Sequence, residues 1–229
     1  MKIERNNSTW LYTADFGDRR AVLKSVTTII DQAFGFYLGF GLDDIQEMVR
    51  ATAAGGKERT ERIVGHALFM ADRFRNAADF GRNVHSMTDL DDDGTLDEET
   101  LDPGLRPLLK AWRTFKDETG FVLIESEVKL ASRLGYAGTA DRIATVDNRA
   151  AVVEIKSRPF NPVTDVLQTA AYKAAWEEMH PGIKLAKRIV ISLNLDGSYS
   201  LNENKGPRDF EVFRCALALS NWRQNHGVD

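Results

Sequence analysis

The sequence predicts a single α/β domain over residues 1–229, in which a mixed central sheet is flanked by helices. Three observations predict it. Apolar residues change from helical spacing to strict alternation near residue 120, an alanine-rich helical segment follows, and a strong hairpin signal comes after that segment. We therefore divide the domain into a mainly helical N-terminal part, 1–104, and an α/β core, 105–229.

The N-terminal part is expected to begin with strands and then to become helical. Residues 9–30 are predicted to form short strands separated by a turn at 16–18. Apolar residues at helical spacing predict helices from about 43 to 87, with a break at 55–56. The segment 89–104 is rich in aspartate and glutamate, and we expect it to be a solvated acidic loop.

The core is expected to alternate between helices and strands. An amphipathic helix starts near Leu105 and ends at Thr119-Gly120, and further helices are predicted over 164–180 and 210–222. The predicted strands are 121–130, 138–146, 151–157, 188–195 and 198–202. The turn between the last two is Asp196-Gly197, which favours a hairpin.

Composition excludes several classes of protein. The single cysteine, Cys215, cannot form an intrachain disulfide or a multi-cysteine zinc or iron–sulfur site. A net charge of −4 argues against a generally basic nucleic-acid binder, so a polyanion would have to be bound by local basic groups or metal ions. No signal-peptide core and no run of roughly 18 apolar residues is present, so we expect a cytoplasmic protein without membrane contacts.

The stretch GYAGTADRIATVDNRAAVVEIKS raises the question of what compensates its acids. Glu154 lies in an apolar strand, where an uncompensated carboxylate costs several kcal/mol. We expect Val146 to pair with Ala151 in an antiparallel hairpin. Asp141 then lies opposite Lys156, and Glu154 projects from the same face, near enough to Asp141 to share a divalent ion. The alternative is an ion pair between Asp141 and Lys156, with Glu154 solvated.

The order of these residues resembles the PD-(D/E)XK nuclease superfamily, and within it the RecB-type and phage exonucleases. The elements that match are G-x-x-D ending at Asp141, (D/E)-x-K from Glu154 to Lys156, and Q-x-x-x-Y from Gln168 to Tyr172. Further similar elements are Gly81–His85, Gly94–Asp97, Ser126-Glu127 and Ser25–Ile30. The proline in the superfamily's name is absent, because Ala140 precedes Asp141.

The resemblance implies a fold, a reaction and partners. It implies a restriction-endonuclease-like core and a Mg²⁺- or Mn²⁺-dependent deoxyribonuclease that binds one or two ions. It further implies exonuclease action in phage or bacterial recombination, repair or end processing. The implied partners are DNA and a recombination or replication protein in a bacterial or phage-infected cell. An iron–sulfur cluster, which some RecB-type nucleases carry, needs more cysteines than this chain has.

The resemblance also implies roles for individual residues. The implied metal ligands are the side chains of His85, Glu127, Asp141 and Glu154 and the backbone carbonyl of Ile155. Lys156 is implied either to lie beside the attacking water or to stabilise charge on the phosphate. Gln168 and Tyr172 share one helix face and are implied to orient the site or to contact the DNA backbone; ordinary helix packing is the alternative.

Several alternatives remain open at this stage. Spacing alone does not separate Glu127 from Glu125, and the resemblance favours Glu127. His66 is a rival to His85, which we prefer because the loop at 94–97 follows it at the family's distance.

Two other functions are also considered. One is a non-catalytic DNA-binding relative of the nuclease fold. The other is a calcium-binding interaction protein that uses the segment 89–100. That segment has acids at the first, third and fifth positions of an EF-hand loop, but Thr100 stands where the loop needs a bidentate glutamate.

Overall fold

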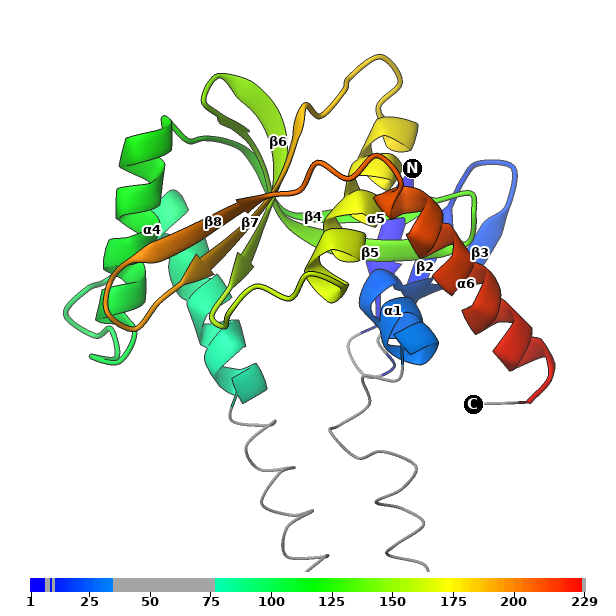
Figure 1. The fold of residues 1–229 in the computed structure, drawn as a ribbon, viewed down its shortest axis with the longest axis horizontal. Helices are drawn as coiled ribbons and strands as arrows, with labels where there is room; N and C mark the ends of the chain where they lie inside the picture. The colour runs from blue at the N-terminus through cyan, green and yellow to red at the C-terminus, as the bar shows by residue number, and fades with distance from the viewer. Residues whose placement is uncertain (7–8, 10, 35–76, 228–229) are drawn as a thin grey trace, which may run out of the picture.

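An open mixed sheet with helices on both faces forms the protein (Figure 1). The computed structural model describes residues 1–6, 9, 11–34 and 77–227. The strands are β1 (Lys2–Arg5), β2 (Tyr12–Asp15), β3 (Arg20–Ser25), β4 (Val122–Ser132), β5 (Tyr136–Val146), β6 (Arg149–Lys156), β7 (Lys187–Leu193) and β8 (Tyr199–Glu203). The helices are α1 (Val26–Phe34), a helix over 77–92, α4 (Arg106–Thr119), α5 (Thr164–Met179) and α6 (Asp209–Asn225).

The order of strands places an opening beside the middle of β5. The sheet runs β1-β2-β3-β5-β6-β7-β8, and β4 pairs with the other edge of β5 along nearly its whole length. On the first edge, β3 pairs in parallel with Tyr136 and Ala137, whereas β6 pairs antiparallel with 142–146. Within the described residues, the edge of β5 at 138–141 therefore has no strand partner on that side.

Two hydrophobic cores lie on opposite faces of the sheet. Ile143 and Val152 pack with α1, α5 and α6. Their neighbours in the chain, Ala144 and Val153, pack with helix 77–92 and α4 on the other face. Figure 1 shows the same two groups of helices on either side of the sheet, with helix 77–92 in cyan. Burial on both faces explains why the central strands are almost continuously apolar.

The β5–β6 hairpin has a different register from the one that the sequence analysis predicts. Val146 pairs with Arg149 rather than with Ala151, so only Asp147 and Asn148 form the turn. Their φ angles of 49° and 58° identify the type I′ turn that suits two-residue hairpins, and both residue types tolerate this left-handed conformation. The predicted pairing of Asp141 with Lys156 is therefore wrong. Because the shift is by an even number of residues, the face on which each side chain lies is unchanged.

Most predicted elements of the core are confirmed within a few residues, and the differences fall near the N-terminus. Residues 26–30, predicted as strand, begin α1, because the Ser25 hydroxyl caps this helix by accepting the Thr28 N–H at 3.0 Å. Strand β1 was not predicted. Residues 35–76, including the predicted break at 55–56 and His66, lie outside the described residues. No helix in the described part of the chain is long and apolar enough to cross a membrane.

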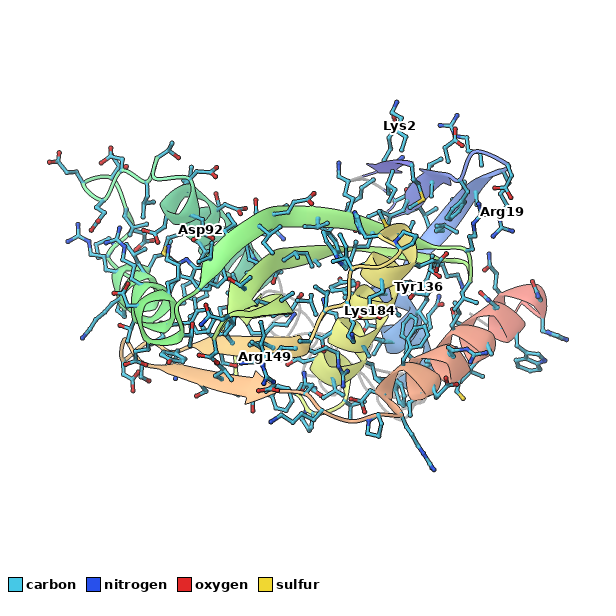
Figure 2. All side chains as sticks on the ribbon, turned by 90° about the horizontal axis from the view of Figure 1, so that it is seen from above. Lys2, Arg19, Asp92, Tyr136, Arg149 and Lys184 are labelled. Carbon is cyan, nitrogen blue, oxygen red and sulfur yellow. The ribbon has the colours of Figure 1, made fainter. Side chains whose placement is uncertain are left out.

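The predicted acidic loop is partly wrong, because helix 77–92 continues through its first four residues. Two of these acids are buried in ion pairs instead of being solvated. The Asp91 carboxylate pairs with Arg113 and Lys116 of α4, each at 2.7 Å. The Asp92 carboxylate, labelled in Figure 2, pairs with Lys116 and with Arg142 of β5, each at 2.8 Å. These charges hold the end of the helix between α4 and the sheet.

Candidate metal centre

The candidate centre lies where β5 and β6 separate. The pairing of β5 with β6 ends at Arg142 and Val153, and beyond it a side chain of β5 bonds to the backbone of β6. The Asp141 carboxylate accepts the backbone N–H of Ile155 at 2.7 Å. The Ile155 N–H no longer bonds to a carbonyl of β5 at this point. The Asp141 carboxylate replaces that carbonyl, so the strands separate without leaving the buried N–H unpaired.

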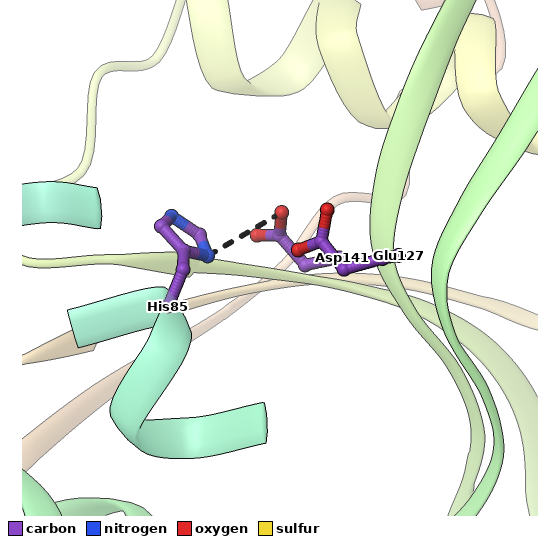
Figure 3. A group of neighbouring side chains, drawn as sticks. All are labelled: His85, Glu127 and Asp141. Carbon is purple, nitrogen blue, oxygen red and sulfur yellow. Dashed lines mark ion pairs between the residues drawn. The ribbon is translucent and has the colours of Figure 1, made fainter. Parts of the chain in front are cut away.

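His85, Glu127 and Asp141 converge at this opening from three elements (Figure 3). His85 comes from helix 77–92, Glu127 from β4 and Asp141 from β5, and one potential ligand atom of each lies within 4.8 Å of the others. The His85 Nδ1 atom is 3.5 Å from Asp141 Oδ1. Two carboxylates and an imidazole at this spacing form a group that could hold a metal ion.

Glu127 reaches this group through an unusual backbone conformation. Its φ angle is 48°, and the only other non-glycine residues with positive φ in the described ranges are the two in the β5–β6 turn. The pairs on either side of it, Ser126 with Arg142 and Val128 with Ala140, place Glu127 level with Asp141. Such a conformation costs about 1–3 kcal/mol and concentrates at functional sites. Glu125, the alternative weighed from the sequence, does not belong to the group.

A hydrogen-bond network fixes Glu154 and Lys156 against α5. The Lys156 ammonium donates to Glu154 Oε1 at 2.8 Å and to Gln168 Oε1 at 3.0 Å. The Gln168 amide donates to the same Glu154 oxygen at 2.8 Å and to the Tyr172 hydroxyl at 3.1 Å. Gln168 and Tyr172 are both buried, and their hydrogen bonds are made to other side chains of this network.

Gly138 leaves room for this network. A Cβ atom at position 138 would lie 2.4 Å from Tyr172 Cε1, a distance that side chains do not tolerate. The glycine three residues before Asp141 is therefore required by the tyrosine ring, which packs against the backbone of β5 beside the opening. The G-x-x-D and Q-x-x-x-Y elements thus meet in space.

Burial shifts the pKa values of the acids upward. Desolvation raises the pKa of Asp141 to about 6, even though Lys156 acts in the opposite direction. Desolvation and then the Asp141 charge raise the pKa values of Glu154 and of Glu127, each to about 7. Burial lowers the pKa of His85. Glu127 is exposed, whereas Asp141 and Glu154 are buried, so two buried acids face the one nearby ammonium of Lys156, as expected of a site that binds a cation.

Two buried polar atoms at the centre have no hydrogen-bond partner, namely Glu154 Oε2 and His85 Nδ1. Glu154 is only 2% exposed, so water does not readily satisfy its second oxygen. Unpaired polar groups of this kind cost about 1–3 kcal/mol each. A cation bound at the group of His85, Glu127 and Asp141 would give His85 Nδ1 a partner, whereas Glu154, also implied as a ligand by the resemblance, lies outside this group of three.

The contacts of Arg142 with helix 77–92 are not apparent in the sequence. A basic residue in a strand is ordinarily exposed, whereas the Arg142 side chain is fully buried. The guanidinium is ion-paired with Asp89 and Asp92, each at 2.8 Å. The sequence near Arg142 does not predict these ion pairs. The alternation of the strand predicts only that Arg142 lies on the sheet face opposite that of Asp141.

The same contacts bear on the calcium alternative. The first four residues of the proposed loop, 89–92, are helical rather than looped. The carboxylates of Asp89 and Asp91, at its first and third positions, are paired with arginine and lysine side chains. An EF-hand loop needs these oxygens for the ion, so the described conformation does not form one.

Comparisons with known proteins give little beyond this geometry. No protein-family model matches the chain, and no curated protein matches it. A similar solved structure is described as "Crystal structure of SSO0001", with a TM-score of 0.37 and 14% sequence identity. The alignment covers 87% of this chain and 75% of that chain. A similarity at this level carries no argument about fold family or function, so the function has to be argued from the residues themselves.

Proposed function

We propose that this chain is a Mg²⁺- or Mn²⁺-dependent deoxyribonuclease with a restriction-endonuclease-like core, acting as an exonuclease. The observation that carries the proposal is the convergence of Asp141, Glu154 and Lys156 at the opening between β5 and β6, with His85 and Glu127 beside them. The reaction is phosphodiester hydrolysis, in which a water oxygen bonds to phosphorus and the ester P–O bond breaks.

The residues fit a hard divalent cation. The candidate donors are the carboxylates of Glu127, Asp141 and Glu154 and the imidazole of His85, an oxygen-rich set of the kind that Mg²⁺ and Mn²⁺ prefer. When bound, the cation supplies positive charge that polarises the phosphate and makes nearby water more acidic. The upward pKa shifts of the acids and the two unpartnered atoms support this assignment, because both would be relieved by a positive charge.

Lys156 acts as a fixed positive charge in this proposal. Burial alone would lower its pKa, but the charges of Glu154 and Asp141 outweigh that effect and the pKa is raised above its ordinary value. A lysine that stays protonated cannot accept a proton from water. A protonated Lys156 supplies positive charge beside the acids, which is what the implied role of stabilising charge on the phosphate requires.

The other residues of the network hold the reacting groups in place. The Ile155 N–H fixes one oxygen of Asp141, which leaves Oδ1 directed toward His85. Gln168 binds both Glu154 and Lys156, and a lysine can only donate while a carboxylate can only accept, so its amide orientation is determined. Tyr172 accepts from the same amide. Both residues act through their neighbours and not by contact with the substrate.

DNA as the substrate rests on the resemblance to RecB-type and phage exonucleases. The chain carries a net charge of −4, so general electrostatic attraction does not provide the phosphate contacts. In this proposal, Lys156 and the bound cation contact the phosphates of the DNA backbone at the centre itself.

Digestion of end-labelled single- and double-stranded DNA tests the proposal. We expect cleavage from the ends with Mg²⁺ or Mn²⁺, no cleavage with a chelator, and a loss of at least about 100-fold in rate for Lys156→Ala. Lys187→Ala is the matched control, since Lys187 is also a strand residue, is similarly shielded and pairs with Asp147. Binding of DNA without cleavage would instead favour the non-catalytic relative. Equal rates for the two variants would remove the role of Lys156.

A further inference from the structure

Arg142 joins the backbones that carry two of the candidate ligands. Its Nη1 donates to the backbone carbonyl of Asp141 at 2.8 Å, and its Nη2 donates to the Thr88 hydroxyl at 3.1 Å. The Thr88 hydroxyl in turn donates to the backbone carbonyl of His85 at 2.9 Å. A continuous chain of three hydrogen bonds therefore links residue 85 of the helix to residue 141 of the strand.

This chain of bonds crosses between separate elements, and the two ligands have no covalent connection nearby. His85 lies on helix 77–92, on the face of the sheet that packs with α4, whereas Asp141 belongs to β5. The direct contact between their side chains is only a 3.5 Å approach without a hydrogen bond. Arg142 joins the helix to the strand through Thr88, Asp89 and Asp92, and the Thr88 link is the one that ends on the backbone of His85.

The charge of Arg142 is neutralised by two acids of helix 77–92. Its Nε donates to Asp92 Oδ2, and Nη2 also pairs with Asp89 Oδ1, each at 2.8 Å. Asp92 is itself held by the Lys116 ammonium at 2.8 Å and by the Trp112 indole N–H at 3.1 Å. Arg142 and Thr88 are both fully buried, so these bonds are shielded from water. A planar guanidinium meets all these partners at once, which an ammonium cannot do.

We propose that Arg142 and Thr88 form a positioning clamp that sets the separation of His85 from Asp141 and thereby lets both bind one cation. The clamp rests on the proposed metal centre, because it acts through two of that centre's ligands. Neither residue touches the substrate or the ion. Groups behind metal ligands commonly change metal affinity about 10- to 100-fold when they are removed.

Thr88→Val tests the clamp, because valine keeps the shape of threonine and removes only the hydroxyl. Thr169→Val is the matched control. Thr169 is equally buried, donates to the Asp165 carbonyl of its own helix and accepts from the Asn204 amide. Both variants lose one buried hydroxyl that donates within its own helix and accepts from another element. Thr169 also has the Val166 carbonyl as a partner, and only Thr88 lies between His85 and Arg142.

The measurement is Mn²⁺ binding by electron paramagnetic resonance, with the nitrogen hyperfine coupling from histidine as a second readout. We expect Thr88→Val to bind Mn²⁺ about tenfold more weakly than wild type and to show a weaker nitrogen coupling. Thr169→Val should match wild type in both, and Thr88→Ser should restore both, since serine returns the hydroxyl. Arg142→Lys is the second variant, and we expect it to lose affinity while keeping the charge that Asp89 and Asp92 neutralise.

The outcomes separate the clamp from the metal centre. If wild type binds Mn²⁺ with a nitrogen coupling that His85→Ala abolishes, but Thr88→Val behaves as Thr169→Val does, the clamp is wrong and the metal centre stands. If wild type and His85→Ala bind Mn²⁺ equally and neither shows the coupling, the proposed centre fails and the clamp fails with it. Thermal unfolding of both valine variants in metal-free buffer shows whether their stabilities are matched.

Discussion

At the scale of single residues, the centre depends on two positions that are unusually constrained. Gly138 is required by the ring of Tyr172, and Glu127 is held in a left-handed conformation beside Asp141. Neither requirement is visible in the sequence, because the residues that impose it come from other strands or from α5. The motif residues can be predicted from their order, but the reason for each residue type requires the fold.

Gly138→Ala should destabilise the protein because the new methyl group collides with the Tyr172 ring. We expect a loss of about 1–3 kcal/mol in the free energy of unfolding, measured with urea. Gly81→Ala is the control. A Cβ atom there would meet only Ser157 Oγ, at 3.7 Å, so alanine in the helix should stabilise by about 0.5–1 kcal/mol. Changes of the same sign in both variants would contradict this explanation.

Asp165 should make stability depend on pH in the acid range. Burial alone would raise its pKa, but bonds from Arg158 and from the Asn161 N–H outweigh burial, and the pKa is lowered below its ordinary value of 3.8. A lowered folded-state pKa contributes stability that is present above pH 3.8 and is lost as the pH falls through the folded-state value.

Asp165→Asn removes this titration, so its stability should change less than that of wild type between pH 5 and about pH 2. The measurement is urea unfolding at several pH values in that window. Asp93→Asn, which changes an exposed acid, should keep the wild-type pH profile. If Asp165→Asn and wild type lose stability in parallel on acidification, the assignment of this pH dependence to Asp165 is wrong.

At the scale of elements, the β5–β6 turn and the end of helix 77–92 determine where the candidate ligands lie. The two-residue turn sets the register that brings Asp141 and Glu154 to the same opening. Its Asp-Asn sequence is typical of a type I′ turn, so the register could have been predicted from the turn residues. The end of helix 77–92 could not have been predicted in this way. Asp92, its last residue, bonds to Trp112 and Arg142, which lie 20 and 50 residues away in the sequence.

Asn148 tests the importance of the turn. Its φ of 58° is costly for a side chain branched at Cβ, so Asn148→Val should lower the free energy of unfolding by about 1–2 kcal/mol. Asn148→Gly should be neutral or stabilising, because glycine adopts this conformation without steric cost. Urea unfolding of both variants provides the measurement, and an equal loss in the two would show that the conformation at position 148 does not limit the hairpin.

Asp91 tests the ion pairs that end helix 77–92. Asp91→Asn weakens contacts with Arg113 and Lys116 while leaving the helix sequence otherwise intact. We expect a loss of about 1–3 kcal/mol in the free energy of unfolding, whereas the exposed Asp93→Asn should change it by less than about 0.5 kcal/mol. The opposite ranking, together with stabilisation of wild type by Ca²⁺, would support the calcium alternative.

At the scale of the whole molecule, the class of fold follows from the sequence more securely than the site does. Alternation in 121–157 and the alanine-rich α5 predict a sheet with close-packed helices, and the structure confirms both. The shared face of Asp141, Glu154 and Lys156 is also consistent with this alternation, since Ile143 and Val152 pack toward α5. His85 lies near these residues because helix 77–92 packs against the sheet. The periodicity of apolar residues in the sequence does not predict that packing.

The central claim is that His85, Glu127, Asp141 and Glu154 form one cation site, and anomalous diffraction from crystals soaked in Mn²⁺ tests it most directly. We predict a strong anomalous peak within bonding distance of His85, Glu127 and Asp141, and its loss in Asp141→Asn crystals prepared in the same way. A wild-type map without a peak at these side chains, or with its only strong peak at the acids of 89–100, would contradict the claim.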